Sequence, residues 1–372
     1  MSPTDKISYR ESFRQNNRPP LNPSLKFSSN VPPVLTKHSQ ALADLNRIMS
    51  VPSRKSLKHV SKEFKRIIPN SAEMVLDAPN ARDDYYCSLL DWASSGDLLV
   101  GLANQSFLWN KNGTLQLVHE TNDIDHISTV AFSPTPKNCG IGTEAGSLLV
   151  YDVSTNNLLH DFEDQDGVSA LIWKSSTEMV TGDPDGNIVH WDIRTSRNRI
   201  LQGHHLDRVV GIAKSVDNVI ATGCNGNIVN IWDDRRLDKP RLVINSHTSA
   251  VRALAWCPWS AHILATGGGL DDGTIQIHNT VTGKLLQKYE SGDQVCQMLW
   301  SLHYKEIISA HNCQSKQLRI YKFPEMKLIH TLPGHNVRPM HLALSPDGQT
   351  VASIGDDETL KVIVFNAVLE VL

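Results

Sequence analysis

Residues 340–363 read MHLALSPDGQTVASIGDDETLKVI, three short apolar segments separated by two turn-like segments. Apolar and polar positions alternate in 340–344 and again in 350–354, which is typical of half-buried β-strands. The segments 345–348 and 356–359 carry the Ser, Pro, Asp and Gly residues that favour tight turns. The stretch therefore predicts three consecutive antiparallel strands, the third at 360–363.

The same plan recurs along most of the chain. Residues 250–279 repeat it as AVRALAW, CPWSAH, ILATGGG, LDDG and TIQIHN, and Trp-Asp pairs stand at 191–192 and 232–233. A residue that closes the third strand returns every 40–46 residues, at Trp109, Tyr151, Trp191, Trp232, His278, Tyr321 and Ile363. A period of this length indicates four-stranded propeller blades. We therefore expect an all-β fold, a closed seven-bladed WD40 β-propeller over 67–366, since closure protects the edge strands.

The repeated histidines and turn aspartates have a structural interpretation. In such blades a His and an Asp hydrogen-bond near the Trp strand, so we expect structural roles for His204, His247, His335, Asp185 and Asp357. The triple glycine at 267–269 lacks the Gly-Lys-Ser/Thr of a phosphate loop, and no Gly-x-Ser-x-Gly occurs. Six cysteines without a CxxC pair and 16 histidines without HExxH give no zinc signature. The sequence therefore predicts no enzyme, catalytic residue, metal or cofactor.

The net charge of −3 conceals two oppositely charged parts. Residues 1–66 hold 13 Lys and Arg against 4 Asp and Glu, whereas the remainder holds 23 against 35. The first part also contains seven prolines and few large apolar residues, which predicts a disordered basic docking tail. Residues 367–372 would form a short C-terminal tail.

One segment of the basic tail differs from the rest. Apolar residues at helical spacing in 39–49 predict a short helix, which either packs on its own domain or binds in a partner's groove. The charges of the tail are spaced rather than blocked, and aromatic residues are few. This favours an anionic protein partner, or simple solubility, over nucleic acid.

The remaining sequence features concern the compartment. No run approaches 18 apolar residues, and the N-terminus lacks the apolar region of a secretory signal, so we expect no membrane association. Scattered, unpaired cysteines fit a reducing compartment. We therefore expect the cytoplasm and nucleus.

Several strings are more specific than a general Trp-Asp repeat and resemble the Cdc20/Fizzy family, in its Cdc20 branch more than its Cdh1 branch. The resemblance covers about 65–366 and rests on 65–69, 76–86, 89–92, 255–259, 264–269, 294–296, 303–309, 344–348 and 357–360. That family activates the anaphase-promoting complex, a ubiquitin ligase, and its propeller holds short degrons. The resemblance implies a substrate adaptor that acts by proximity. The implied partners are ligase subunits, degron-bearing cell-cycle proteins such as cyclins, and checkpoint proteins.

The resemblance also implies two degron sites. A destruction-box degron presents an Arg and, three residues later, a Leu. The acids that match the family's receptor for this Arg are Asp77 and Glu358. Without the resemblance, Asp77 would be interpreted as a local cap and Glu358 as an ordinary turn residue. For the KEN degron the matching positions are Asp84, Asn225, Asn227, Gln294 and Arg338. Asp84 would meet the Lys, Arg338 the Glu, and the amides other polar atoms.

The chain departs from the family pattern at several places. Leu270 stands where the family often has Thr, which predicts weaker or altered KEN binding. No clean N-terminal docking box or checkpoint-binding motif is visible, and the chain ends in Val368–Leu372 rather than Ile-Arg. We expect divergent docking motifs, a specialised copy, for example in meiosis, or a shortened form. A degron-binding inhibitor or decoy and an unrelated WD40 scaffold are the alternative functions.

Overall fold

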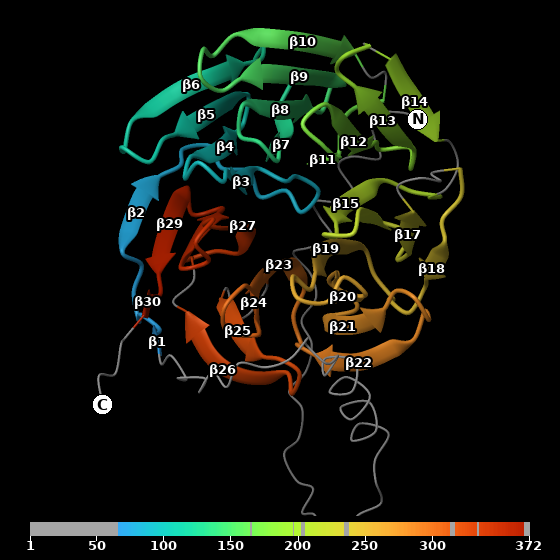
Figure 1. The fold of residues 1–372 in the computed structure, drawn as a ribbon. Coiled ribbons are helices and arrows are strands. Elements are labelled where there is room, and N and C mark those ends of the chain that lie inside the picture. Colours follow the sequence, from blue (N-terminus) through green and yellow to red (C-terminus); the bar gives the residue numbers. More distant parts are fainter. Residues whose placement is uncertain are drawn as a thin grey trace, which may run out of the picture. The chain divides into compact units, whose positions relative to one another are not determined.

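The computed structural model describes residues 66–163, 166–195, 197–201, 205–233, 238–312, 317–332 and 335–367. Every regular element within these residues is a β-strand. The strands form seven four-stranded antiparallel sheets and one two-stranded sheet. The seven larger sheets surround a common centre as the blades of a propeller, which confirms the predicted fold (Figure 1).

We number the blades in chain order. Blades 1 to 3 comprise β3 Leu90–Trp92, β4 Leu98–Leu102, β5 Gln105–Trp109, β6 Leu115–Glu120, β7 Ile127–Phe132, β8 Asn138–Thr143, β9 Ser147–Asp152, β10 Leu158–Glu163, β11 Ala170–Trp173, β12 Glu178–Gly182, β13 Ile188–Asp192 and β14 Arg197–Leu201. Blades 4 and 5 comprise β15 Val209–Lys214, β16 Val219–Cys224, β17 Val229–Asp233, β18 Leu242–Ile244, β19 Val251–Trp256, β20 Ile263–Gly268, β21 Thr274–Asn279 and β22 Leu285–Glu290. Blade 6 comprises β23 Val295–Ser301, β24 Glu306–His311, β25 Leu318–Lys322 and β26 Lys327–Leu332. Blade 7 comprises β27 Pro339–Leu344, β28 Thr350–Gly355, β29 Thr359–Val364 and β2 Met74–Asp77.

The ring closes with strands from both ends of the repeat region. Blade 7 takes its outer strand, β2, from the start of the propeller, and Asp77 lies opposite Thr359 in the β2–β29 ladder. Outside this blade, β1 (Arg66–Ile67) pairs with β30 (Asn366–Ala367). This two-stranded sheet extends one residue beyond each end of the predicted domain, 67–366. Early and late segments are thereby joined, so the last blade cannot form without residues nearly 300 positions away.

The core lies between neighbouring blades. The second strand of a blade packs against the first strand of the next, as β20 does against β23, and β20 is buried along its whole length. Buried residues of blades 5 and 6, among them Ile277, Met298 and Trp300, form one such layer. Strands covered on both faces have near-continuous apolar runs, as the sequence ILATGG of β20 does.

Indole groups connect the innermost strands of adjacent blades. The Nε1 groups of Trp173, Trp256 and Trp300 donate to the carbonyls of Ala131, Ala213 and Ala255 at 3.1, 3.2 and 2.9 Å, respectively. Each bond joins one blade to the preceding one. A buried indole N–H thus has a partner, and the rotation of one blade against the next is restricted.

The centre of the ring contains a buried cation. Arg252 of β19 is 6% exposed, and its guanidinium donates to the carbonyls of Cys87, Cys296 (2.8 Å) and Met340 (2.9 Å) and to His341 Nδ1 (2.8 Å). These partners belong to β23 of blade 6, β27 of blade 7 and the segment before β3 of blade 1. One side chain therefore connects four blades across the central channel. Burial lowers the pKa of Arg252.

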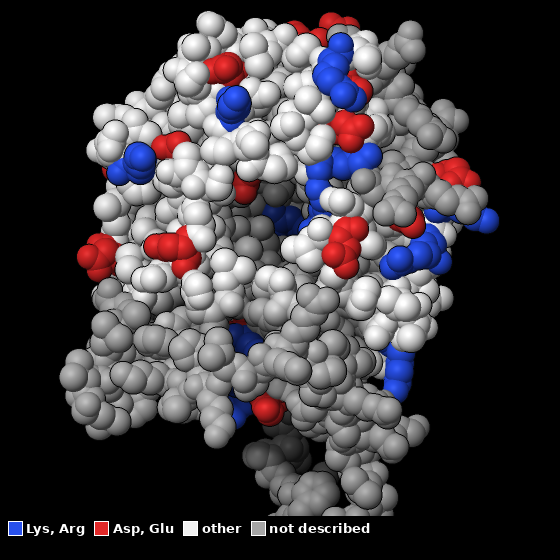
Figure 2. Space-filling model, viewed as in Figure 1, with Lys and Arg blue, Asp and Glu red and all other residues white. Residues whose placement is uncertain are grey.

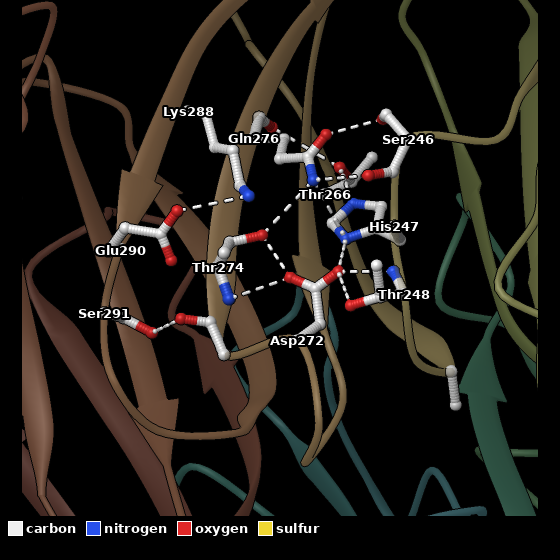
Figure 3. Close-up of polar contacts among 12 residues, drawn as sticks. Ser246, His247, Thr248, Thr266, Asp272, Thr274, Gln276, Lys288, Glu290 and Ser291 are labelled. Atoms are coloured by element: carbon white, nitrogen blue, oxygen red, sulfur yellow. Dashed lines mark hydrogen bonds and ion pairs between the residues drawn. The ribbon is translucent and has the colours of Figure 1, made fainter.

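Histidine–aspartate pairs lock two blades, as predicted for His247, His335 and Asp357. His247 Nδ1 lies 3.0 Å from Asp272 Oδ2, and its Nε2 lies 2.6 Å from Thr266 Oγ1 (Figure 3). His335 Nδ1 lies 2.7 Å from Asp357 Oδ1 in blade 7. Although burial opposes it, hydrogen bonds from Thr359 and His335 lower the pKa of Asp357 to about 2.

The other two expected structural residues have different outcomes. Asp185 is exposed, and the buried carboxylate of its turn is Asp183, which accepts the backbone N–H of Asp185 at 2.9 Å. The interpretation of Asp185 as a locking residue was therefore wrong. His204 lies outside the described residues, and its neighbour His205 contacts Thr222 Oγ1 at 2.7 Å.

The tails remain predictions. Residues 1–65 and 368–372 lie outside the described part of the chain, and so do the expected helix at 39–49 and most of both tails. Among the described residues, no helix is long and apolar enough to cross a membrane.

Candidate functional site

A cavity of about 350 Å³ opens where blade 7 meets blade 1. The walls come from β2 and β29 on one side and from β4 and β5 on the other. The lining is mostly apolar and consists of Leu76, Asp77, Ala78, Pro79, Asn80, Val100, Leu102, Asn104, Gln105, Phe107, Trp109, Gly113, Leu115 and Leu360. Sequence analysis did not identify these apolar residues as a site. The spacing of Phe107 and Trp109, two residues apart and therefore on one face of β5, was a usable signal, and both side chains are half-buried.

Ring closure places Glu358 next to the end of β2, which carries Asp77. Glu358 lies in the turn between β28 and β29 with φ of 54°, and its carbonyl accepts the backbone N–H of Ala78 at 2.7 Å. Its carboxylate accepts the N–H of Asn80 at 3.3 Å. Both acidic side chains are exposed, and Asp77 itself lines the cavity. The result is an apolar cavity with two carboxylates beside it, which suits a ligand carrying a cation next to an apolar side chain.

A second set of predicted residues lies along one edge of the blades. In an antiparallel blade the first strand begins, and the second strand ends, at the same edge. Asp84 precedes β3, Gln294 precedes β23, Arg338 precedes β27, and Asn225 and Asn227 lie between β16 and β17. We call this edge, with these five residues, the entry face.

Hydrogen bonds join two of these residues through Tyr86. The backbone N–H of Tyr86 donates to Asp84 Oδ1 at 2.8 Å, and its hydroxyl donates to Asn225 Oδ1 at 3.0 Å. Asn225 in turn donates to Asp207 Oδ2 at 2.7 Å, and Arg208 lies 5.5 Å from the Tyr86 ring centre. Tyr86 therefore bridges the start of blade 1 to blade 4, and sequence reasoning did not include it.

The other three residues have different surroundings. Gln294 is only 7% exposed, and its Oε1 accepts a bond from Asn312 at 2.7 Å, which holds the amide in place. Asn227 lies in the turn between β16 and β17 and has a φ of 67°, a backbone conformation that asparagine tolerates in turns. Arg338 donates through Nε to Asp83 Oδ1 and through Nη2 to the Asp83 carbonyl at 3.0 Å.

The space-filling view shows a hollow at the centre of the ring, bordered by both basic and acidic side chains (Figure 2).

The family model that describes the CDC20/Fizzy WD40 domain matches residues 76–362, which is most of the chain. The chain belongs to the Cdc20/Fizzy family.

Relatives within the Cdc20/Fizzy family are similar over most of the chain. The anaphase-promoting complex subunit cdc20 of Dictyostelium discoideum is 36% identical over 334 residues, covering 88% of this chain and 66% of that protein. The meiotic fizzy-related protein 1 of Schizosaccharomyces pombe is 32% identical over 83% of this chain and 74% of its own length. The chain thus spans about two thirds to three quarters of the length of these relatives.

A solved structure extends the likeness to three dimensions. A chain in the crystal structure of a mitotic checkpoint complex has a TM-score of 0.76 and 33% identity, covering 85% of this chain and 97% of the other. The family match, the relatives and this structure agree with the predicted resemblance and with the propeller described above.

One cluster of side chains in this Cdc20/Fizzy propeller consists of residue types that commonly bind metal ions. Asp84, Cys87 and Glu144 place ligand atoms within 4.8 Å of one another. Arg82 already lies 2.6 Å from Glu144 and 3.8 Å from Asp84, and burial raises the pKa of the Cys87 thiol. A protonated thiol and a resident guanidinium fit an ion-paired cluster better than a metal. The expectation of no metal remains a prediction.

Proposed function

We propose that the protein is a non-enzymatic substrate adaptor and activator of the anaphase-promoting complex. The proposal is supported by family membership and by the names of relatives, which describe cdc20 proteins as subunits or cofactors of that complex. The observation that carries it is the apolar cavity between blades 7 and 1 with Asp77 and Glu358 beside it. An adaptor needs such a peptide site, because it acts by raising the concentration of substrate near the ligase.

The cavity suits a destruction-box degron. The degron's Arg would pair with Asp77 and Glu358, while its Leu, three residues on, would enter the apolar cavity. Three extended residues span at most about 10 Å, so both anchors must be close together. This requirement is consistent with Asp77 being part of the cavity lining.

The first test measures the affinity of a destruction-box peptide by fluorescence polarisation. Changing Asp77 and Glu358 together to Ala should weaken binding about ten- to hundredfold, because hydrogen bonds to charged groups contribute about 1.5–3 kcal/mol. Asp217→Ala, in the exposed turn between β15 and β16, removes one carboxylate at the opposite edge and serves as the control. Unchanged affinity of the double variant would refute this assignment.

A reconstituted ubiquitination assay tests the activator role. The chain should stimulate modification of a destruction-box substrate by the purified ligase and should co-precipitate with ligase subunits. Degron binding without ligase binding would identify an inhibitor or decoy instead. Partners that share no degron would indicate a WD40 scaffold of another kind.

The entry face would receive the KEN degron, with Asp84 near its Lys, Arg338 near its Glu, and Asn225, Asn227 and Gln294 near polar atoms.

We also propose that the substrates include cyclins, that checkpoint proteins are partners, and that the protein has a meiotic role. Similarity to a chain of a mitotic checkpoint complex and to a meiotic fizzy-related protein supports the last two. Affinity capture from mitotic and meiotic cells would separate them.

We also propose residence in the cytoplasm and nucleus. Five cysteines, Cys87, Cys139, Cys224, Cys257 and Cys296, are free thiols in the described structure, which is consistent with a reducing compartment. Imaging of a tagged chain through division would test this.

A further inference from the structure

Arg338 on the entry face already holds a carboxylate of its own chain. Its Nε donates to Asp83 Oδ1, and its Nη2 donates to the Asp83 carbonyl at 3.0 Å. The two residues are 255 positions apart and meet only because blade 7 closes against the start of blade 1. The Nε and Nη2 groups form one edge of the guanidinium fork, the edge that also suits an incoming carboxylate.

We propose that Asp83 is an internal competitor for Arg338 and disfavours peptides that present an acidic residue to this point of the entry face. The inference rests on the proposed degron-binding function and deepens it. The carboxylate of Asp83 has the same chemistry as the Glu of a KEN degron. Such a Glu would have to displace Asp83 before it could use the same donors.

The surroundings of Arg338 add to this effect. Asp83 is followed directly by Asp84, and Asp356 lies close enough for Asp83 to contribute, after burial, to its raised pKa. Arg82 lies 3.8 Å from Asp84, so a degron carboxylate arriving beside Arg338 would mainly meet the negative charges of Asp83 and Asp356. Like charges at such distances repel, so a neutral or basic peptide residue is favoured.

An incoming carboxylate can displace Asp83 from Arg338. The Asp83 side chain is 47% exposed and that of Arg338 is 18% exposed. Water can solvate Asp83 when it is released, and ion pairs at such exposure are weak. The internal pair should therefore weaken KEN binding by a few fold and change its selectivity without abolishing it.

The test compares three peptides by fluorescence polarisation: one with Lys-Glu-Asn, its Lys-Gln-Asn counterpart, and a destruction-box peptide. Asp83→Asn should bind the Lys-Glu-Asn peptide about three- to fivefold more tightly than the unchanged chain, as expected from the loss of a surface ion pair. The Lys-Gln-Asn and destruction-box peptides should change by less than twofold. Asp217→Asn makes the same charge change at the opposite edge and should alter none of the three affinities.

The outcomes are distinguishable. Destruction-box binding with no gain for Lys-Glu-Asn in Asp83→Asn would overturn the role of Asp83 and leave the adaptor function standing. An equal gain for Lys-Glu-Asn and Lys-Gln-Asn would also overturn it, because the effect would not involve the Glu. No binding of any peptide to any variant, with circular dichroism showing folded protein, would overturn both proposals.

Discussion

At the scale of single residues, His278 shows how one substitution alters a blade. In blades 3 and 4 the indoles of Trp191 and Trp232 donate to threonine hydroxyls at 2.8 Å. His278 occupies the corresponding position on β21 of blade 5, and the described structure shows no hydrogen bond at its Nε2. Burial and the nearby His247 lower the pKa of His278 to about 3.

This pKa makes stability depend on pH. Between the folded value of about 3 and the unfolded value of about 6.5, the unfolded chain binds the proton more readily. The contribution is therefore fully present above the unfolded pKa and is lost as pH falls through this window. The loss approaches about 1.4 kcal/mol per pH unit for one such group.

We expect the free energy of unfolding to fall from pH 7 to pH 5, with about 2 kcal/mol of the loss due to His278. His278→Phe should remove that part of the pH dependence, whatever its effect on stability at pH 7. Denaturant unfolding at the two pH values measures it, with His262→Phe, at an exposed histidine, as the control. An unchanged pH dependence in His278→Phe would contradict the assignment.

At the scale of elements, the inner strands depend on bonds between blades as well as on their own ladders. The indole of Trp256 at the end of β19 donates to Ala213 O in blade 4. The sequence indicated the strand but not the partner of the indole. That partner is set by how blade 5 packs on blade 4.

Trp256→Phe keeps an aromatic ring but removes this donor. We expect the free energy of unfolding to drop by about 1–2 kcal/mol, the usual value of such a bond with its packing. Trp109→Phe should cost less, because this half-buried indole on β5 has no hydrogen bond to any residue in the described part of the chain. Equal losses in denaturant unfolding would mean that the interblade bond contributes nothing specific.

At the scale of the whole molecule, Arg252 connects blades 5, 6, 7 and 1 across the channel. Its buried charge is costly, but its donors satisfy three inward-facing carbonyls. Removing it leaves these carbonyls without that partner. The balance of the two effects determines its contribution to ring closure.

We expect Arg252→Met to lower the free energy of unfolding by about 2–4 kcal/mol, because several hydrogen bonds to a charged group are lost. Arg252→Lys keeps the charge but has fewer fixed donors, so it should fall in between. Denaturant unfolding measures both variants. A Met variant as stable as the original would show that desolvation cancels the hydrogen bonds.

Local sequence patterns were enough to predict the all-β propeller, its seven blades, the two locking histidines and the family, because strand alternation, turn residues and repeat spacing are local properties. The fold of the whole ring determined which side chains come into contact. The cavity between blades 7 and 1, the Tyr86 bridge and the Arg338–Asp83 pair join residues that are far apart in the sequence, 139 positions for Tyr86 and Asn225 and 255 for Asp83 and Arg338. Such contacts follow from closure of the ring, and no local pattern specifies which side chains closure will place together.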